Sequence, residues 1–287
     1  MSKILDGKIV RDEIMLDLKN KVSGFTAVPN LAIIKIGDNP DSDIYVKNKL
    51  NFARKIGVNA FIVDLGLIEE KKVTQERLLA GIEKLNNDES INGIIIQSPL
   101  PEPLDWAEAV EKVSPEKDVD GLCSVNVKKL QNNKTGIVPA TARGVLTLLD
   151  YYNISVKGKK VVVMGRSALV GKPIATLMIN NGATVTVCHS KTINPEKETR
   201  EADILIVAVG KPELVGADYV KEGQVIVDVG ISSVINKDGT KKVYGDVDFD
   251  SVKNIVAAIS PVPGGVGPMT VASLFQNLVE AFEKQNS

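Results

Sequence analysis

The sequence contains few of the residues that build metal centres and disulfide frameworks. Among its 287 residues are one histidine, His189, and two isolated cysteines, Cys123 and Cys188. A single histidine excludes a histidine-rich metal site, and two separated cysteines argue against a disulfide framework or a cysteine-based zinc site. We therefore expect no bound metal and look for catalytic groups elsewhere.

Long apolar runs and an excess of one charge are also missing. No apolar run approaches the roughly 20 residues that span a bilayer, and the apolar stretch within Met1–Lys8 is too short for a signal peptide. Lysine and arginine number 35 against 36 aspartate and glutamate, which gives a formal net charge of −1 without blocks of like charge. These features predict no membrane or nucleic-acid partner and a cytoplasmic location.

Apolar runs of strand length alternate with amphipathic helical patterns along the chain. Strands are expected at 31–36, 61–65, 93–97, 161–164, 184–188, 203–208 and 224–228, with helices at about 42–56, 74–85, 141–152 and 269–284. Continuous apolar strands between helices indicate parallel sheets covered on both faces, and right-handed crossovers stack such units into doubly wound domains. The length leaves room for two domains.

One segment combines a strand, a glycine loop, a helix and a second strand. Val161–Met164 ends at Gly165, a helical pattern begins after Gly171, and the strand Thr184–Cys188 follows. This order opens a dinucleotide-binding unit, in which a helix N-terminus receives a phosphate. The loop is not the common G-x-G-x-x-G, and such glycines are often only turn and packing residues. An ATP-binding P-loop is disfavoured, because Pro173 replaces the magnesium-binding Ser or Thr.

The end of the second strand favours NADP over NAD. This position normally carries Asp or Glu, which binds the ribose 2′-hydroxyl of NAD. Here Ser190 and Lys191 follow the strand, and Arg166 lies in the glycine loop. A hydroxyl and cations suit a 2′-phosphate. His189, beside them, is expected to be a strand-end residue that lines the cofactor pocket.

We expect an α/β protein of two domains. The first, a doubly wound domain, covers residues 1–140 and is completed by the C-terminal helix 268–287, whose apolar stripe must dock and is expected to pack back on this domain. The second covers residues 141–267 and is Rossmann-like.

Side chains suited to chemistry occur outside the nucleotide unit. Tyr45 and Lys49 are four residues apart and share a helix face, although such a pair is commonly a solvated stripe. Gln97 ends a strand, where open α/β sheets place ligands. Asp118 and Asp120 stand in a turn-like segment, which ordinary turn chemistry also explains.

Together these motifs resemble the bifunctional methylenetetrahydrofolate dehydrogenase/methenyltetrahydrofolate cyclohydrolase family over nearly the whole chain. The similar segments are 37–40, 45–49, 93–101, 115–121, 165–173, 188–192, 202–212, 244–248 and 261–270. The resemblance implies NADP-dependent oxidation of 5,10-methylenetetrahydrofolate, then hydrolysis of the methenyl product to 10-formyltetrahydrofolate. It also implies a homodimer that binds tetrahydrofolate one-carbon derivatives and serves purine, methionine and histidine biosynthesis, with folate on the first domain and NADP on the second.

The resemblance also assigns roles to individual residues. It implies that Lys49, Gln97 and Asp120 are catalytic and contact the substrate. Further substrate contacts are implied for Tyr45, Pro263, Gly264 and Gly265, and cofactor contacts for Gly165, Arg166, Ser167, Ser190 and Ile231. A lysine in a partly dry pocket has a lowered pKa and can exchange protons near neutrality. The Pro263–Gly265 run, taken alone, also fits a plain hinge.

Three positions depart from the family pattern. Ser98 stands where leucine is common, Ala140 replaces a cysteine and Ala142 replaces a proline. These changes put the balance of the two activities in question. The alternatives are a dehydrogenase with an impaired cyclohydrolase step and a catalytically silent NADP- or folate-binding protein.

Overall fold

The computed structural model describes residues 2–37, 39–63, 65, 73–235 and 241–286. The chain forms two compact units. We call residues 13–140 with 271–287 the Lys49 unit, and residues 1–12 with 141–270 the Gly165 unit. The chain passes from one unit to the other within α1 (Gly7–Ser23), at the start of α6 (Ala140–Tyr151) and within α10 (Val266–Gln285).

The Lys49 unit is built on a three-stranded parallel sheet in the order β3-β2-β4. Its elements are β2 (Asn30–Ile34), β3 (Asn59–Val63), β4 (Gly93–Ile96), α2 (Pro40–Ile56), α3 (Gln75–Asn86), α4 (Trp106–Lys112) and α5 (Ser124–Gln131). Alternate strand residues face opposite sides of a sheet. Ala32, Ile34, Ile94 and Ile96 share a core with α3 and α4, and the intervening Leu31, Ile33 and Ile95 are buried as well. Both faces of the sheet are therefore covered, as the continuous apolar runs predicted.

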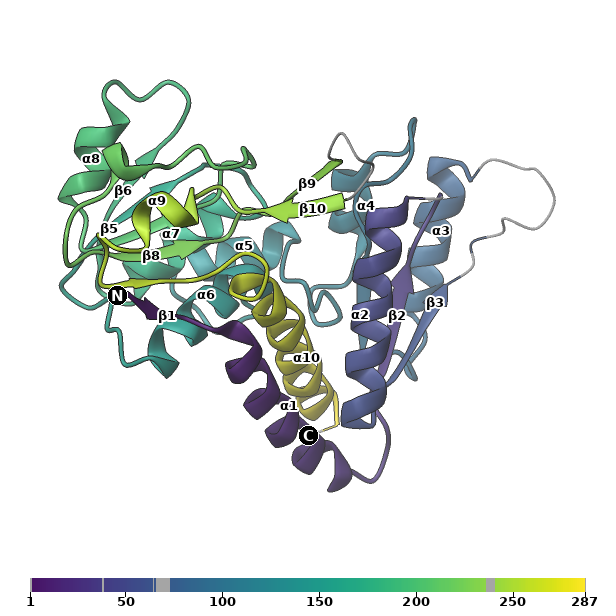
Figure 1. Ribbon diagram of the computed structural model, residues 1–287. Coiled ribbons are helices and arrows are strands. Elements are labelled where there is room, and N and C mark those ends of the chain that lie inside the picture. The colour runs from purple at the N-terminus through teal and green to yellow at the C-terminus, as the bar shows by residue number, and fades with distance from the viewer. Residues whose placement is uncertain (1, 38, 64, 66–72, 236–240, 287) are drawn as a thin grey trace. The chain divides into compact units, whose positions relative to one another are not determined.

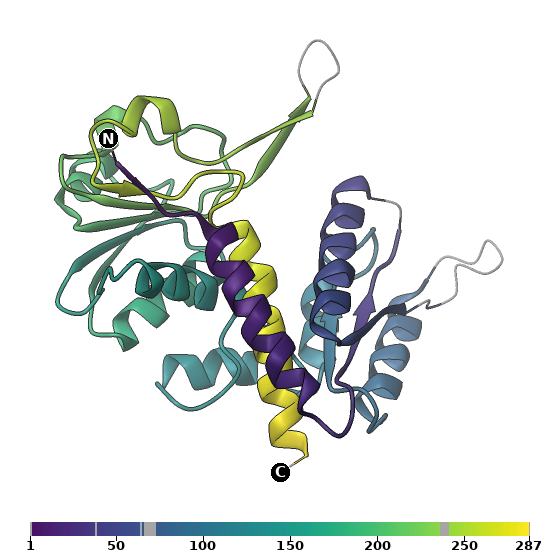
Figure 2. The same cartoon turned by 60° about the horizontal axis from the view of Figure 1, so that its bottom comes forward.

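The C-terminal helix packs back on the Lys49 unit, which confirms the prediction. Helices α1 and α10 lie side by side in both ribbon views (Figures 1 and 2), and Lys21 Nζ of α1 pairs with Glu283 of α10 at 2.7 Å. Phe275 of α10 stacks on Phe52 of α2, with ring centroids 4.9 Å apart. The apolar stripe of α10 is thus buried against the unit that carries Lys49.

The Gly165 unit contains a six-stranded parallel sheet in the order β1-β11-β8-β7-β5-β6. Its strands are β1 (Lys3–Ile4), β5 (Lys160–Met164), β6 (Thr184–Cys188), β7 (Ile204–Val207), β8 (Val225–Asp228) and β11 (Ala258–Ile259). Its helices besides α6 are α7 (Gly171–Asn180), α8 (Pro195–Glu201), α9 (Phe249–Val252) and the 3-10 turn η1 (Ala217–Tyr219). Because β1 pairs with β11, residues 1–12 belong to this unit, whereas the sequence analysis placed them in the first domain.

An antiparallel pair stands apart from the six-stranded sheet. It consists of β9 (Ser232–Ile235) and β10 (Lys241–Tyr244), and the sequence analysis did not predict it. The pair lies in the chain between β8 and β11, and after β10 an isolated parallel bridge joins Val247 to Val215.

The strand order reverses around β5. The chain runs from β5 to β6 on one side, then crosses back to β7 on the other side and continues to β8. In open α/β sheets, ligands bind outside the carboxyl ends of the strands at such a switch point. Gly165 directly follows β5 and therefore stands where this topology places a ligand.

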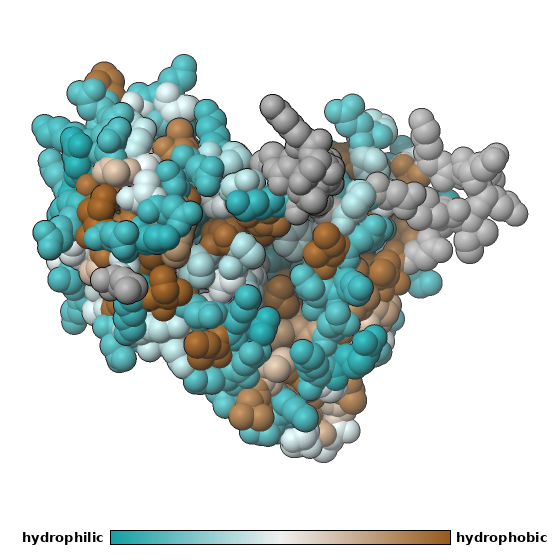
Figure 3. Space-filling view, viewed as in Figure 1, coloured by the Kyte–Doolittle hydropathy of each residue, from teal (hydrophilic) through white to brown (hydrophobic). Residues whose placement is uncertain are grey.

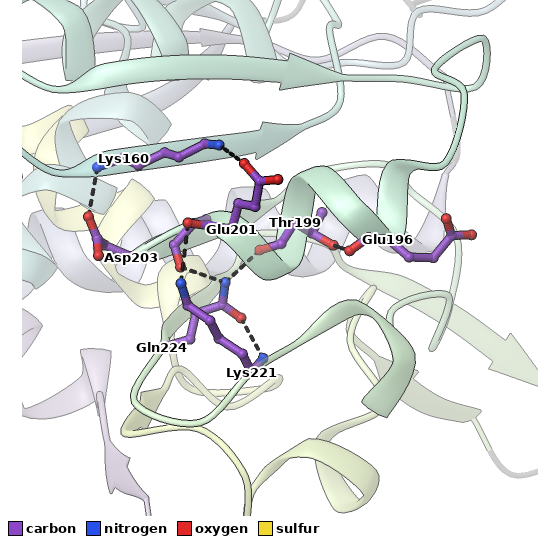
Figure 4. A network of polar contacts seen from close by, with 8 residues as sticks. Lys160, Glu196, Thr199, Glu201, Asp203, Lys221 and Gln224 are labelled. Atoms are coloured by element: carbon purple, nitrogen blue, oxygen red, sulfur yellow. Dashed lines mark hydrogen bonds and ion pairs between the residues drawn. The ribbon is translucent and has the colours of Figure 1, made fainter.

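The opposite, amino-terminal edge of the same sheet is closed by a polar network (Figure 4). The fully buried Gln224 donates from Nε2 to the carbonyls of Thr199 (2.7 Å) and Ala202 (3.0 Å), at the end of α8. The backbone N–H of Lys160 donates to Asp203 Oδ2 at 2.8 Å. The two bonds from Gln224 satisfy carbonyls at the end of α8, where helix carbonyls otherwise lack partners. Side chains thus hold the amino-terminal edge of the sheet.

The face in Figure 3 is largely hydrophilic, with scattered hydrophobic patches. In the part of the chain that the structure describes, no helix is both long enough and apolar enough to cross a membrane.

Candidate active site

Lys49 and Gln97 come together from a helix and a strand end. Lys49 lies in α2, and only 9% of it is exposed. Its Nζ donates a hydrogen bond of 2.9 Å to Oε1 of Gln97, the residue directly after β4. The Nε2 of Gln97 donates to the carbonyl of Ser98 at 2.9 Å, which directs the amide oxygen to the lysine. The strand end thereby orients the amine.

A turn attached to β4 carries Asp120. The buried Asp118 accepts hydrogen bonds from the N–H groups of Gly121 (3.0 Å) and Cys123 (2.9 Å) and from Nδ2 of Asn126 (3.0 Å). A parallel bridge joins Asp118 to β4. Asp118 therefore performs the turn chemistry that the sequence offered for both aspartates. The sequence analysis missed this supporting role, for which the D-x-D-G spacing is the available signal.

Burial makes charge costly for both Lys49 and Asp120. Desolvation lowers the pKa of Lys49 below its usual 10.5, while the nearby Asp120 acts in the opposite direction. Desolvation also raises the pKa of Asp120 above its usual 3.8; Lys49 opposes this rise and Asp118 adds to it. Since both groups move toward neutrality, a proton passes between them and a bound molecule more easily than between exposed groups. The cluster is suited to acid–base chemistry.

Tyr45 stands one helical turn before Lys49 on α2. Residues four apart lie on the same helix face, and Tyr45 is 37% exposed. Its ring is therefore accessible to a flat ligand that approaches the lysine.

Of the three positions that depart from the family pattern, Ala140 contacts the turn that carries Asp120. Ala140 is 1% exposed, and its N–H donates to the carbonyl of Asp120 at 3.1 Å. Ala142 is also buried, whereas the side chain of Ser98 is exposed. Position 140 is therefore tied through its backbone to the turn that carries Asp120.

The glycine loop of the other unit is shaped by close backbone contacts. Gly165 has a φ of +118°, and a Cβ there would overlap the carbonyl of Ala208. A Cβ on Gly171, the first residue of α7, would overlap the carbonyl of Gly165. Ser167 Oγ accepts the N–H groups of Val170 and Gly171 at 3.3 Å each. A tight glycine cradle at a helix N-terminus fits the phosphates of a dinucleotide.

The other predicted cofactor residues follow strands of the same sheet. Gly165 N–H donates to the carbonyl of Cys188 at 2.9 Å, which ties the glycine loop to the end of β6. Ser190 lies just beyond and is exposed, as are Arg166 and Ile231. Because the carboxyl ends of parallel strands meet at one edge, the loops that carry these residues share that edge.

His189 has a local role in this turn. Its ring Nδ1 accepts a hydrogen bond from the backbone N–H of Lys191 at 3.1 Å, and its backbone N–H donates to Thr192 Oγ1 at 2.9 Å. The sole histidine of the chain therefore shapes the loop after β6.

The Pro263–Gly265 run belongs to the Gly165 unit. The N–H of Gly7 donates to the carbonyl of Gly264 at 2.9 Å, and Gly265 N–H donates to the carbonyl of Pro261 at 2.7 Å. Gly264 has a φ of +119°. The run therefore packs on the start of α1, and its contact with substrate stays a prediction.

These features define a dinucleotide-binding α/β protein with a separate buried lysine–carboxyl site. A family profile described as the tetrahydrofolate dehydrogenase/cyclohydrolase catalytic domain matches residues 5–120, and the profile of its NAD(P)-binding domain matches residues 139–286. The chain therefore belongs to the tetrahydrofolate dehydrogenase/cyclohydrolase family, as the resemblance predicted.

Relatives with similar sequence and structure carry the same description. The bifunctional protein FolD of Lactobacillus gasseri is 44% identical over 100% of this chain and 99% of its own. The bifunctional FolD enzyme of Campylobacter jejuni gives a TM-score of 0.92 at 40% identity, with 99% of each chain covered. The Trypanosoma brucei enzyme, solved with NADP cofactor and inhibitor, gives 0.91 at 36% identity, covering 99% of this chain and 98% of that one.

Proposed function

We propose that this protein is a bifunctional one-carbon folate enzyme. It oxidises 5,10-methylenetetrahydrofolate to 5,10-methenyltetrahydrofolate with NADP, and it hydrolyses the methenyl group to give 10-formyltetrahydrofolate. The observation that carries this proposal is the buried Lys49–Gln97 pair, with the half-buried Asp120 nearby, within the catalytic segment of a family member.

In the hydrolytic step, Lys49 accepts and donates a proton. Water adds to the methenyl carbon and loses a proton, and one carbon–nitrogen bond of the ring then breaks as its nitrogen gains a proton. A lysine with a lowered pKa can accept and return that proton near neutrality. Gln97 holds the amine in place through the 2.9 Å hydrogen bond. We assign Asp120 to the pterin edge and Tyr45 to stacking on the folate.

NADP accepts the hydride in the oxidation step. We assign the phosphates to the cradle of Gly165 and Ser167, the 2′-phosphate to Arg166 and Ser190, and a cofactor contact to Ile231. The glycine cradle at the start of α7 and the exposure of Arg166 and Ser190 support this assignment. Pro263, Gly264 and Gly265 are assigned to a wall beside the substrate. The Lys49 unit then holds folate and the Gly165 unit holds NADP.

We also propose a cytoplasmic homodimer. The resemblance implies the dimer. Strand β6 is an edge strand of the six-stranded sheet, and its Val187 is 39% exposed. Edge strands are commonly covered by another chain or protected. Light scattering tests the dimer, and a monomeric mass would contradict it.

The experiment that tests the function supplies methylenetetrahydrofolate with NADP+ and, separately, with NAD+, and then supplies methenyltetrahydrofolate without nucleotide. We expect faster formation of reduced NADP than reduced NAD, and hydrolysis without nucleotide. Reduction without hydrolysis would leave a dehydrogenase with an impaired second step. Binding without either reaction would leave a silent binding protein.

A further inference from the structure

Two buried aspartates of the Gly165 unit have no role in the proposed reactions. Asp228 is the last residue of β8 and is 2% exposed, and Asp246 lies shortly after β10 and is fully buried. Carboxylates are rarely buried unless they are paired or hydrogen-bonded. Within the described residues, neither of them forms an ion pair, so their partners must lie elsewhere.

The partners of Asp246 are three successive backbone N–H groups. Its carboxylate accepts from Val209 (2.6 Å), Gly210 (2.9 Å) and Lys211 (2.8 Å), which form the loop directly after β7. Consecutive N–H groups that converge in this way form an anion-binding concavity. Here a carboxylate of the protein itself fills that concavity and fixes the loop.

Asp228 bonds to the backbone on both sides of the loop that follows β8. Its Oδ1 accepts from the N–H groups of Gly230 (3.0 Å) and Asp246 (3.1 Å), and its Oδ2 accepts from Val247 (2.9 Å). Its own N–H donates to Ser260 Oγ at 2.8 Å. Asp228 therefore links the exit of β8 to the segment that carries Asp246 and to Ser260.

Two glycines leave room for these carboxyl groups. A Cβ on Gly230 would overlap the carboxyl of Asp246, and a Cβ on Gly245 would overlap that of Asp228. The backbone thus approaches the carboxyl groups as closely as glycine allows.

The segments held by the pair adjoin residues to which the cofactor is assigned. Ala208 precedes the Val209–Lys211 loop, and its N–H donates to the carbonyl of Met164 at the end of β5. The carbonyl of Ala208 lies where a Cβ on Gly165 would stand. Gly230 directly precedes Ile231. Asp246 is therefore linked through the Val209–Lys211 loop to Ala208 and the glycine loop, and Asp228 is linked through Gly230 to Ile231.

We propose that Asp228 and Asp246 are positioning residues for the dinucleotide, which hold the loops after β7 and β8 in the arrangement that receives it. The inference rests on the proposed function only for the identity of the ligand, NADP. The aspartates act through backbone N–H groups and do not touch the reacting atoms.

The two aspartates are expected to differ in their response to neutral substitution. Burial and the neighbouring Asp246 raise the pKa of Asp228 to about 7, although its three N–H bonds oppose the rise. A neutral side chain at 228 therefore resembles a form that wild type already populates near neutral pH. The larger effect is expected at Asp246.

The test compares Asp246→Asn and Asp228→Asn with Asp250→Asn, an exposed control on α9. NADP+ affinity is measured by calorimetry, and amide hydrogen exchange of residues 208–211 and 230–231 is measured without nucleotide. For Asp246→Asn we expect affinity to fall about tenfold or more, since three charge-assisted hydrogen bonds are weakened, and exchange to rise in those segments. Asp228→Asn gives a smaller change, and the control gives none.

Two results would overturn the proposal. One is unchanged NADP+ affinity and exchange in folded Asp246→Asn and Asp228→Asn proteins. The other is a parallel loss of NADP+ binding, protection throughout the chain and methenyl hydrolysis, which would mean a general structural role. A wild-type protein that binds no NADP+ would instead refute the proposed function, and exchange in the nucleotide-free variants would still decide whether the pair holds the loops.

Discussion

The candidate sites of the two units rely on different kinds of chemistry. In the Lys49 unit, Lys49 and Gln97 form a buried pair beside Asp120, and desolvation lowers the pKa of Lys49 and raises that of Asp120. In the Gly165 unit, the site is an edge of backbone and glycine, with Arg166 and Ser190 exposed to solvent. One site is built to move protons, and the other is built to hold phosphates.

This difference explains why the two sites should respond to different substitutions. A buried polar cluster depends on the identity of each side chain, because a lost partner leaves the other group buried and unsatisfied. A backbone cradle depends on space and dihedral angles, so that one added Cβ is as disruptive as the loss of a functional group. The following substitutions test this division.

The largest effect is expected for Lys49→Met. The variant keeps an unbranched side chain but removes the proton-transfer group, so methenyl hydrolysis should fall by about 10²- to 10⁴-fold. Hydrolysis is measured by methenyl absorbance without nucleotide, and NADP+ binding by calorimetry should persist. Lys47→Met, at an exposed position of the same helix, is the matched control. A hydrolysis rate near that of wild type would rule out the assigned role of Lys49.

Gly165→Ala should do the reverse. A Cβ here meets the Ala208 carbonyl at a φ of +118°, and strain of a few kcal/mol should weaken NADP+ binding by roughly 100-fold. Hydrolysis without nucleotide should change much less. The control is Gly158→Ala, because Gly158 also has a positive φ, +73°, but no atom lies within 4 Å of its Cβ position. Equal losses of both activities would break the division between the units.

A smaller and more selective effect is expected for Arg166→Ala. A charge-assisted contact with phosphate contributes about 1.5–3 kcal/mol, and the exposure of Arg166 favours the lower end of this range, so NADP+ affinity should fall about tenfold. NAD+ lacks the 2′-phosphate and serves as the matched ligand, with little change expected. Competition binding measures both, and an equal loss for the two nucleotides would refute the 2′-phosphate assignment.

The smallest effect is a pH dependence of stability. Since burial lowers the pKa of Lys49, the native state holds fewer protons than the unfolded state between that lowered pKa and the usual 10.5. The free energy of unfolding therefore gains a contribution that rises with pH through this window. Urea unfolding at several alkaline pH values should show a steeper rise for wild type than for Lys49→Met. Parallel curves would show that Lys49 carries no such shift.

The sequence predicted the α/β class well because parallel strands buried on both faces leave continuous apolar runs. The bounds of α2 and α10 lie within a few residues of those expected. Residues 1–12 were assigned differently because β1 is too short to show its partner, β11, in the sequence. The antiparallel pair of β9 and β10 was missed for a similar reason, since short polar strands give a weak pattern.

Some features of the candidate sites could be predicted from the sequence, and others depend on the folded structure. The spacing of Tyr45 and Lys49 on one helix is local, so the sequence could show it. The hydrogen bond from Lys49 to Gln97 spans 48 residues and depends on how α2 packs on the sheet that contains β4. The sequence shows Asp118, Asp228 and Asp246 only as ordinary turn residues. Their role is visible in the folded structure, where backbone N–H groups converge on their carboxylates.

The measurement that most directly tests the account is an NMR titration of the Lys49 side chain, assigned by comparison with Lys49→Met. A buried, desolvated amine predicts a pKa clearly below 10.5, and Asp120→Asn should lower it further because Asp120 favours the charged form. A pKa at or above 10.5 in wild type would contradict the account, since an ordinary charged lysine could not exchange protons near neutrality at this site.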